Sequence, residues 1–453
     1  MEYFTGGDDV YQTTGIVLKS DSELALYCKE MCSAAKLFKN TVIFRCRQLL
    51  SANYKNYSDL QVHEQEVLNE FKLTEERFKP IGSNYYLPGY LHFDYLFKVT
   101  ENPDYYNKLP MQSNQQIIKG VLADFKGYFK AVKSYKKNPK AFTGKPKLPT
   151  YCKADKISFD ITNQDCVVKT GKDGISYLKL PKTKLTVNLG KLVINKLKEV
   201  TIKPFYNTYK ICIISEEPDI EPVELDYENY LSVDLGIDNF ITSSNNCGLT
   251  PFIVKGNIIK SYNQWFNKKV SYLQSLLPYG QHSSHQIQQL WKKRYHKIAD
   301  FYNKTAHYVI KYCMDHEIGN LVIGKNTYWK QNINLGKQNN QNFCYISHAS
   351  FIKKVCEMAS KFGIRVILNE ESYTSKASFL DNDKFPVYGE VNHPDFSGRR
   401  IHRGLYQSKK GILINADVNG ASNILKKAVP TAFDKTLNYT YLYQTVNTIH
   451  VNP

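Results

Sequence analysis

An apolar run with a single acid near its centre most constrains how this chain can fold. Residues 230–238 read Tyr-Leu-Ser-Val-Asp-Leu-Gly-Ile-Asp, and the central acid is Asp234. Aromatic and β-branched residues favour a strand here, and Gly236 favours a turn into a second strand at 240–242. A third strand-like run follows at 252–254. The sequence therefore predicts three hairpin-linked strands with a carboxylate on the first.

Further strands are predicted toward the carboxyl end. Residues 320–324 and 364–369 are apolar, and a helix at 351–362 separates them, capped by Ser347 and closed by Gly363. A strand, a helix and a strand in this order require a parallel or mixed sheet. The last of these strands ends at Glu370 and Glu371. A final helix beginning near residue 414 and continuing through Leu425 includes Asp417.

The amino-terminal half has two parts with different patterns. Helical spacing predicts helices at 24–42, 60–71, 74–78 and 111–132, with Ser20 or Asp21 capping the first and aromatic loops at 85–86 and 105–106. Residues 150–222 instead carry short strand-like runs separated by turns, which predicts a small antiparallel sheet or barrel that the strand at 15–18 can join. Acids and prolines at 216–222 indicate a domain boundary. One long helical stretch is expected at 258–316, in a position to face a nucleic-acid duplex.

Charge and aromatic content point to a polyanionic partner. The chain has 453 residues, with 60 Lys and Arg against 42 Asp and Glu, and it carries 34 Tyr and 23 Phe. Rings and lysines alternate most densely at 119–150, where Asp124 is the only acid. This pattern suits a nucleic-acid backbone groove, and a solvated helix face is the alternative. The candidate contacts in this segment are Lys126, Tyr128, Lys130, Lys133, Lys136 and Lys137.

The sequence also argues against several other classes of protein. No run reaches the roughly 20 apolar residues that span a bilayer, and the first ten residues are acidic, so a cytoplasmic protein is expected. The ten cysteines are scattered without a CxxC pair, which favours reduced thiols over a disulfide framework or a four-thiolate zinc site.

Three motifs, in order and spacing, resemble those of a known family. They are Val-Asp-Leu-Gly-Ile-Asp at 233–238, Glu-Ser-Tyr-Thr-Ser-Lys at 371–376, and Asn-Ala-Asp-Val-Asn-Gly-Ala at 415–421. Together they resemble the RuvC-type nuclease motifs of TnpB (OrfB) proteins, transposon-encoded RNA-guided DNA nucleases related to compact type V CRISPR effectors. The resemblance extends to the Lys-Pro-Lys-Leu-Pro segment at 145–149 and to the amino-terminal helix.

The resemblance implies a multidomain α/β protein with a ribonuclease-H-like (RuvC) mixed-sheet nuclease domain. That domain comprises 223–371 and 415–430, beside a helical recognition domain at 21–149 and a wedge-like β-barrel at 1–20 and 150–222. Residues 372–414 form a target-nucleic-acid-binding insert, and 431–453 a carboxy-terminal tail. The implied partners are a guide RNA, from a transposon or a CRISPR array, and double-stranded target DNA read beside a short motif.

By the same resemblance, Asp234, Glu371 and Asp417 are the catalytic carboxylates and hold two Mg²⁺ ions, with Glu370 as the alternative to Glu371. Hard Mg²⁺ prefers such oxygen ligands. Neighbouring residues on a strand point to opposite faces, so only one of the two glutamates can reach the metals. Lys376, Arg399, Arg400 and Arg403 are the expected nucleic-acid contacts of the insert.

The chain departs from the family pattern in two places. Most members carry the second glutamate after the strand at 321–323, whereas here Gly324 begins Gly-Lys-Asn, so we expect the glutamate to have moved to 370–371. Members also carry paired CxxC elements after Thr-Ser-Lys, but no cysteine occurs from Ala377 to Asp417, so no zinc is expected. His393 and His402 remain there, and without thiolates they are read as solvated or phosphate-facing.

Three functions stay open at this point. The first is an RNA-guided DNA endonuclease. The second is an RNA-guided DNA-binding repressor that does not cut, motivated by the missing acid at Gly324. The third is a ribonuclease-H-like transposase that joins DNA ends, because the same carboxylate set performs that chemistry.

Overall fold

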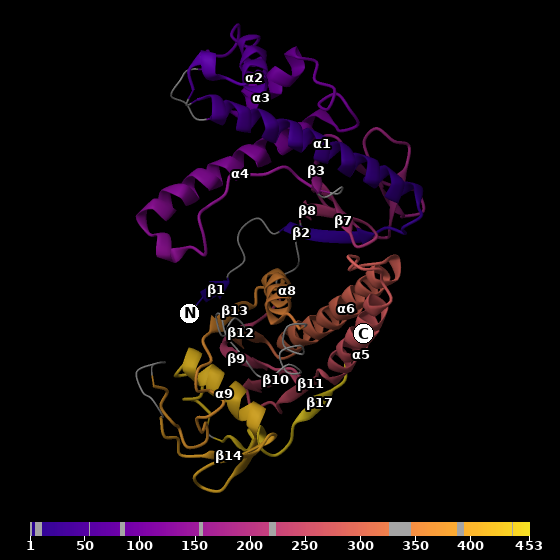
Figure 1. Ribbon diagram of the computed structural model, residues 1–453. Coiled ribbons are helices and arrows are strands. Elements are labelled where there is room, and N and C mark those ends of the chain that lie inside the picture. Colours follow the sequence, from indigo (N-terminus) through magenta and orange to yellow (C-terminus); the bar gives the residue numbers. More distant parts are fainter. Residues whose placement is uncertain are drawn as a thin grey trace. The chain divides into compact units, whose positions relative to one another are not determined.

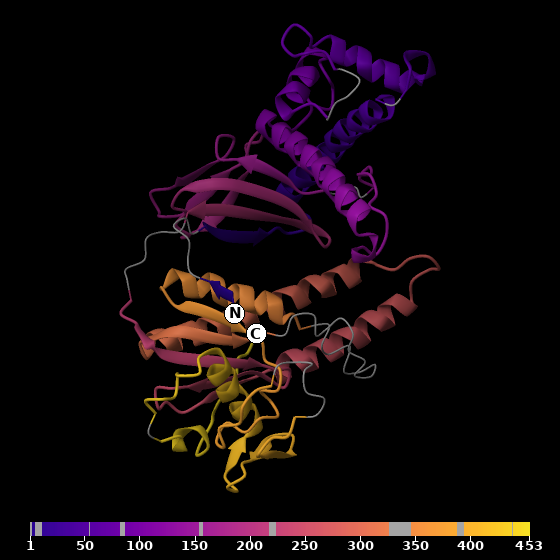
Figure 2. The ribbon, with the colours of Figure 1, turned by 90° about the vertical axis from the view of Figure 1, so that its left-hand side faces the viewer.

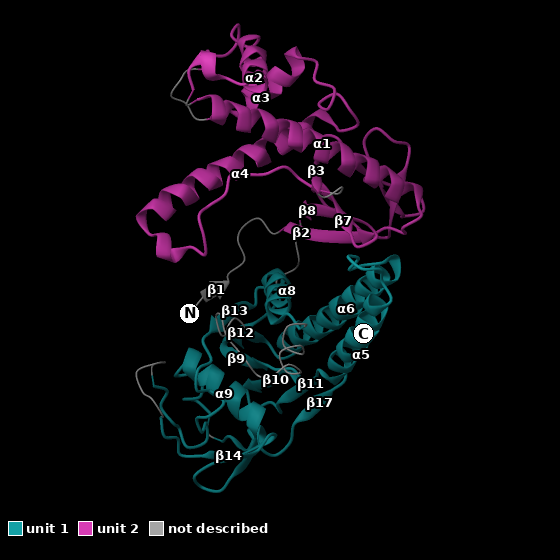
Figure 3. Ribbon diagram, in the orientation of Figure 1, with its two compact units in different colours: residues 1–10, 219–453 teal, residues 11–218 magenta. Residues whose placement is uncertain are grey.

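The computed structural model describes residues 2–4, 11–53, 55–81, 87–153, 157–216, 223–325, 346–386, 394–436 and 438–453. The chain forms two compact units, residues 1–10 with 219–453, and residues 11–218 (Figure 3). Figure 1 labels their helices and strands. Among the described residues, no helix combines the length and the apolar character needed to cross a membrane. Residues 326–345, His393 and the expected aromatic loop at 85–86 lie outside the described residues.

The unit at 11–218 combines helices with two antiparallel sheets. Its helices are α1 (Glu23–Ala52), α2 (Val62–Lys72), α3 (Tyr90–Val99) and α4 (Met111–Lys137), and Phe38, Phe93, Phe97 and Tyr105 lie buried among them. The helix expected at 74–78 is a turn, α3 was not predicted, and α1 is capped by Ser22 rather than by Ser20 or Asp21. The Ser22 hydroxyl accepts a hydrogen bond from the Ala25 amide, which a helix starting at Glu23 leaves free.

Strands from both ends of this unit share one sheet. The order is β2 (Tyr11–Val17), β8 (Thr208–Glu216), β7 (Leu197–Phe205) and β3 (Phe159–Thr162). The pairing of β2 with β8 confirms that the strand near residue 16 joins this sheet. A second sheet contains β4 (Val167–Thr170), β5 (Ser176–Lys179) and β6 (Thr186–Gly190).

The other unit is built on a seven-stranded sheet in the order β1, β13, β12, β9, β10, β11, β17. The three hairpin-linked strands predicted around Asp234 are β9 (Asp226–Leu235), β10 (Asn239–Asn245) and β11 (Phe252–Lys255), and they pair antiparallel. Strands β12 (Ile318–Gly324) and β13 (Arg365–Asn369) pair parallel, as the strand-helix-strand order required. The edge strands are β1 (Glu2–Phe4) and β17 (Asn447–Ile449).

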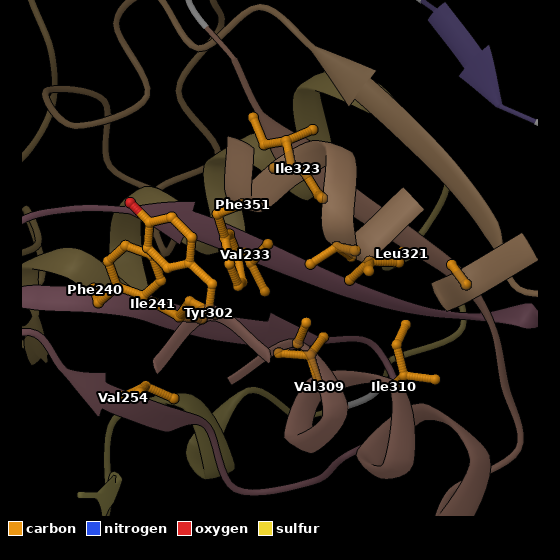
Figure 4. Packing of buried hydrophobic residues seen from close by; sticks show 14 of the residues in the cluster. Val233, Phe240, Ile241, Val254, Tyr302, Val309, Ile310, Leu321, Ile323 and Phe351 are labelled. Atoms are coloured by element: carbon orange, nitrogen blue, oxygen red, sulfur yellow. The ribbon is translucent and has the colours of Figure 1, made fainter. Parts of the chain in front are cut away.

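Helices cover both faces of this sheet (Figure 2). Helices α6 (His285–Asp315) and α8 (His348–Lys361) pack on one face, and α9 (Ala416–Ala428) packs on the other. Figure 4 shows the first of these cores, in which Val233, Phe240, Leu321 and Ile323 meet side chains of α6 and α8. Val322 belongs to the core on the α9 side. Successive strand residues therefore alternate between the two faces, as a pleated strand requires.

Several predicted helices have different limits in the structure, and α1 runs ten residues past its expected end at residue 42. The stretch expected at 258–316 is broken into α5 (Asn257–Ser275) and α6, because Pro278 and Gly280 lie in the turn between them. Helix α4 runs five residues past the expected end at Val132. The cap at Ser347 is confirmed, and the final helix begins at Ala416, two residues after the expected start. Gly363 ends α8 with a φ of 74° that glycine adopts at little cost.

Candidate active site

Asp234 lies on the sheet face that α9 covers. Val233 belongs to the core on the opposite face, so the next residue along β9 points toward α9. Asp234 pairs in register with Thr242 of β10. The alternation of one strand thus places a single carboxylate between the sheet and a helix.

Small residues allow α9 to approach this carboxylate closely. A Cβ atom added to Gly420 would lie 2.9 Å from Asp234 Oδ2. At the next two helix positions, the Ser232 hydroxyl donates to the Ala421 carbonyl at 2.7 Å, and the Ser244 and Ser422 hydroxyls lie 2.7 Å apart. The Asp-Val-Asn-Gly-Ala-Ser motif at 417–422 therefore positions the helix as well as supplying an acid.

Asp417 lies in the first turn of α9, where a carboxylate is favoured by the helix dipole. The Asn415 side chain caps this helix by accepting from the amides of Asp417 and Val418. The two oxygens of Asp417 accept from Asn239 Nδ2 at 2.7 Å and from Arg400 at 3.1 Å. Lys255 donates in turn to Asn239 Oδ1 at 2.8 Å, which fixes the orientation of the amide.

Glu371 uses the space that a side chain at position 324 would need. A Cβ atom built on Gly324 would lie 2.5 Å from Glu371 Oε2 and 2.7 Å from Ile424 Cδ1. Ile323 belongs to the core on the opposite face, so position 324 faces α9, as Asp234 does. Glu371 thus brings a carboxylate to the strand end where the family pattern has a glutamate and this chain has glycine.

Glu370 is held in a different way from its neighbour. Lys427 donates to Glu370 Oε2 at 2.5 Å, and the Ser372 amide donates to Oε1 at 2.6 Å. Partial burial alone would raise its pKa, but the bonds from Lys427 and Ser372 hold the pKa below its ordinary value. Strand β13 ends at Asn369, so the two glutamates separate in the turn after the strand and not through strand alternation as expected.

Burial and like charge perturb two of the candidate carboxyl groups. Burial, the charge of Glu371 and the charge of Asp417 raise the pKa of Asp234 to about 8, although nearby Arg400 opposes the shift. Burial and the charge of Glu370 raise the pKa of Glu371 to about 7. Acids whose charges disfavour one another are typical of functional sites, where a bound cation can relieve the repulsion.

A cleft of about 460 Å³ opens over Asp234 and Asp417. Its lining comes from the turn after β9, from the start of β10, from α9 and from the insert. The lining residues are Asp234, Gly236, Ile237, Asp238, Asn239, Thr242, Arg400, Arg403, Gly404 and Asp417. The lining of the cleft therefore combines carboxylates with arginines.

The donor set suits a hard divalent cation, because its charged members are carboxylates. Asp234 and Asp417 share the cleft, while Glu371 acts on Asp234 through its charge and is not a lining residue. In the part of the chain that the structure describes, no group of three or more acids, histidines or cysteines is drawn together closely enough to hold a metal. The Asp417 carboxylate is instead engaged by Arg400 and Asn239.

The insert brings two of its expected basic residues to the cleft. Arg399 and Arg400 lie on β14 (Arg399–His402), and Arg403 follows in the turn before β15 (Leu405–Gln407). Arg403 pairs with Asp238, which also accepts from Lys260 at 2.6 Å. Arg399 and Lys376 are exposed outside the lining, and His402 lies on exposed β14. The hairpin therefore contributes Arg400 and Arg403 to the candidate site.

Two aspartates hold the insert together by accepting hydrogen bonds from its backbone amides and hydroxyls. Asp383 accepts from the Ser378 amide at 2.8 Å and from the Ser397 amide at 3.1 Å. Asp381 accepts from the Ser378 hydroxyl at 2.6 Å and from the Lys409 amide at 2.7 Å. These bonds tie residues 378–383 to Ser397, just before β14, and to Lys409, which lies between β15 and β16 (Leu413–Asn415).

The predicted lysines of the amino-terminal half lie along α4 in the other unit. Lys126, Lys130, Lys133, Lys136 and Lys137 are exposed, and Tyr128 is half-buried. Their spacing of three and four residues forms a basic stripe on the solvent side of the helix. Asp124 on this helix lies 3.5 Å from Lys39.

Sequence reasoning missed Asn239, Lys255 and the Asp238 ion pairs. Asn239 begins the strand that pairs with β9, so counting register across the turn at Gly236 would have placed it near the strand end that holds Asp234. No local motif indicates Lys255, because its contact with Asn239 depends on the pairing of β10 with β11.

Comparison with known proteins gives an independent account of this region. Residues 211–330 match the OrfB_IS605 family, described as a probable transposase. A TnpB-like protein, ORF457 of Acidianus two-tailed virus, is 26% identical over 247 residues, covering 51% of this chain and 49% of that protein. The match thus spans about half of the relative's length. Both findings confirm the resemblance to TnpB proteins.

Solved structures also align with most of the chain. A Cas12f1–sgRNA–target DNA complex matches at 12% identity and a TM-score of 0.49, covering 89% of this chain and 82% of the other. The mini-RNA-guided endonuclease Cas_phi3 matches at 10% identity and a TM-score of 0.44, covering 95% and 93%.

Proposed function

We propose that this protein is an RNA-guided DNA endonuclease that cuts target DNA beside a short motif read by the protein. One observation carries the proposal. The carboxylate of Glu371 lies where a side chain at Gly324 would lie, so the acid lost from one strand end is replaced from the next. The family match and the TnpB-like relative support the same class of activity.

The strand order supports a ribonuclease-H-like nuclease domain within this proposal. Three consecutive antiparallel strands, β9 to β11, are followed by β12 on the other side of β9 and then by β13, both parallel to β9. In the other unit we assign α1–α4 to nucleic-acid recognition and the sheets around β7 and β8 to a wedge-like domain. The acidic cleft and the basic stripe of α4 are consistent with these roles.

Within the proposal, Asp234, Glu371 and Asp417 would hold Mg²⁺, which would supply Lewis-acid activation of water and charge stabilisation of the departing oxygen. Asp234 supplies the central carboxylate because the charges of both other acids act on it. Asn239 and Arg400 orient Asp417 by donating one hydrogen bond to each of its oxygens, which leaves further lone pairs for a cation. Arg400 and Arg403 line the same cleft and can contact a phosphate backbone there.

Substitution of the two glutamates tests the assignment. Protein copurified with its RNA is assayed for cleavage of guide-matched DNA in Mg²⁺, comparing Glu371→Gln with Glu370→Gln. We expect Glu371→Gln to lose cleavage and Glu370→Gln to keep most of it, because Glu370 is engaged by Lys427 and Ser372. Unchanged cleavage by Glu371→Gln would exclude Glu371 from the site.

A guided DNA-binding repressor is the second candidate. It is favoured by the glycine at 324 and by the engagement of Asp417 with Arg400. Wild-type protein that binds a guide-matched duplex but never cuts it would establish this alternative. A transposase that joins ends would instead give joined products in a strand-transfer assay, and such products would overturn the proposal.

A further inference from the structure

We propose that the outer face of α5 binds a single-stranded stretch of nucleic acid by stacking its bases on Trp265 and Tyr272. The inference deepens the proposed function, on which it rests for the presence of nucleic acid near this domain. It assigns a ligand to the α5–α6 hairpin, which lies outside the carboxylate cleft.

Helices α5 and α6 form an antiparallel pair with its own small core. Asn263 Oδ1 accepts from Arg294 Nε at 2.8 Å, and the rings of Phe266 and Trp291 lie 4.7 Å apart. Residue numbers rise along one helix as they fall along the other, so the helices run in opposite directions. Phe266, Val270 and Ile287 are buried between them. The apolar side chains that hold the two helices together thus lie on the inner face of α5.

A second stripe of large side chains remains on the outer face. Trp265 is 49% exposed, Tyr272 57% and Leu276 63%. Each lies one position before a residue packed into this small core, namely Phe266, Leu273 and Leu277, which places it about 100° around the helix. Large apolar side chains grouped in one stripe, unlike scattered ones, are typical of a surface that binds a partner. The stripe is therefore a candidate binding surface.

The spacing of the rings matches a stacked strand. Trp265 and Tyr272 are seven residues apart on α5, a rise of about 10.5 Å. Stacked nucleotides are separated by about 3.4 Å along a strand, so roughly three fit along this distance. Every base has a π-face, and stacking on aromatic rings is tolerant of sequence. Tyr262 extends the platform, with its ring 5.4 Å from that of Trp265.

The positive charge at residues 257–299 favours a polyanion as the ligand. Residues 257–299 contain no Asp or Glu, whereas Lys268, Lys269 and Lys297 lie among or beside the rings. Lys269 Nζ is 5.3 Å from the centre of the Tyr272 ring, and Lys297 Nζ is 5.1 Å from that of Tyr262. Lysines beside stacking rings can contact the phosphates that link stacked bases.

The same charges disfavour a second copy of the chain as the occupant. Two such faces brought together would place lysines against lysines, with no acid at residues 257–299 of either copy to balance them. A duplex is also a poorer fit, because its bases are stacked internally and cannot cover the exposed rings. Single-stranded RNA and single-stranded DNA share the required chemistry, and the test below separates them.

The test measures binding of the full-length chain, freed of copurified RNA, to 20-nucleotide oligo(U), to oligo(dT) and to a blunt duplex of equal length at fixed salt. Trp265→Ala/Tyr272→Ala is compared with wild type and with Gln264→Ala, an exposed control on the same helix. We expect the ring variant to bind one or both single strands at least tenfold more weakly, with duplex binding unchanged. Trp265→Phe/Tyr272→Phe keeps the rings and should restore binding.

Several outcomes would overturn the inference. They are equal binding of single strands by the ring variant and wild type, an equal loss of duplex binding, or loss of self-association in sedimentation as the only effect. Trp265 is one of three tryptophans, so quenching of its emission by oligonucleotide gives a direct readout that the Phe variant should lack. Circular dichroism confirms folding of each variant.

Failure here is distinguishable from failure of the proposed function. Guided cleavage that survives alongside unaltered single-strand binding by the ring variant would refute the stacking site alone. Ring-dependent single-strand binding without any guided cleavage would refute the nuclease and leave the stacking site standing.

Discussion

Two groups of aspartates in this protein have different surroundings, one stabilised by hydrogen bonds and the other destabilised by nearby negative charge. In the insert, Asp381 and Asp383 accept hydrogen bonds from backbone amides and hydroxyls at 2.6–3.1 Å. At the cleft, Asp234 is partly buried and lies near two further acids, so its pKa rises to about 8. The hydrogen bonds of the first group stabilise the folded insert. The repulsion among the acids of the second group lowers the stability of the folded protein when no cation is bound.

This difference in hydrogen bonding and pKa indicates which acids are candidates for a catalytic role. A carboxylate that is supplied with several donors stabilises the loops that provide them. Acids that raise one another's pKa destabilise the fold, so their presence together indicates a function that needs them. Binding of a cation is the simplest such function. Burial alone does not separate the groups, because both contain partly buried residues.

The sharpest test of this difference replaces one acid from each group. Asp234→Asn should reduce guided cleavage by about 1,000-fold or more, because a central cation ligand stabilises the transition state by several kcal/mol. Asp381→Asn should leave residual cleavage far higher when assayed below its unfolding temperature. Equal losses in the two variants would contradict the division of roles.

Moving the carboxylate from position 371 to position 324 should give the next largest effect on cleavage. Gly324→Ala should impair both folding and cleavage, because its Cβ would lie 2.5 Å from Glu371 Oε2. In Gly324→Glu/Glu371→Ala the new carboxylate enters the vacated space, and we expect cleavage about 100-fold above that of Glu371→Ala alone. Rates from guided cleavage of a plasmid measure this cycle. Rescue that fails in a folded double variant would contradict the spatial exchange.

Loss of an acid in the insert should act on stability. Asp383→Ala removes the acceptor of two backbone amides and of the Ser397 hydroxyl. Leaving such donors unpaired costs about 1–3 kcal/mol, which thermal unfolding detects. A zinc-selective chelator should leave the wild-type transition unchanged, and a large downward shift would show that a metal supports the insert.

The smallest expected effect is a pH dependence of metal affinity. The pKa values of Asp234 and Glu371 are raised to about 8 and about 7, so a cation must displace protons from both. Mg²⁺ affinity measured by calorimetry should rise about tenfold from pH 7 to pH 8, close to one proton released on average. Asp234→Asn should flatten this rise, and a flat wild-type curve would contradict the raised pKa values.

The same raised pKa predicts the direction of a stability change. Between pH 4 and pH 8 the unfolded chain has lost the Asp234 proton that the folded chain retains, so stability without metal falls as pH rises. Asp234→Asn removes this penalty, and its unfolding temperature at pH 8 should exceed that of wild type.

Much of the sheet was predictable from sequence because its signals are local. The apolar run around Asp234, the turn at Gly236 and the caps at Ser347 and Gly363 each act within a few residues. The break between α5 and α6 was also encoded locally, in Pro278 and Gly280, but the helical pattern on either side obscured it.

The contacts within the candidate site depend on tertiary packing and were harder to predict. Sequence motifs indicated Asp234, Glu371 and Asp417, but not that the space at Gly324 accommodates the Glu371 carboxylate. The Asn239–Asp417 contact joins residues 178 positions apart, and only the closure of α9 on the sheet brings them together. The aspartates of the insert carry no motif, because any donor-rich loop can use them.

Guided cleavage tests the central claim most directly. The protein is purified with its bound RNA, the RNA is sequenced, and a plasmid matching its variable segment is incubated with the complex in Mg²⁺. We predict cuts at the matched site that disappear in Asp234→Asn while DNA binding persists. Bound, matched plasmid that stays intact with wild-type protein, or is cut equally by Asp234→Asn, would contradict the account.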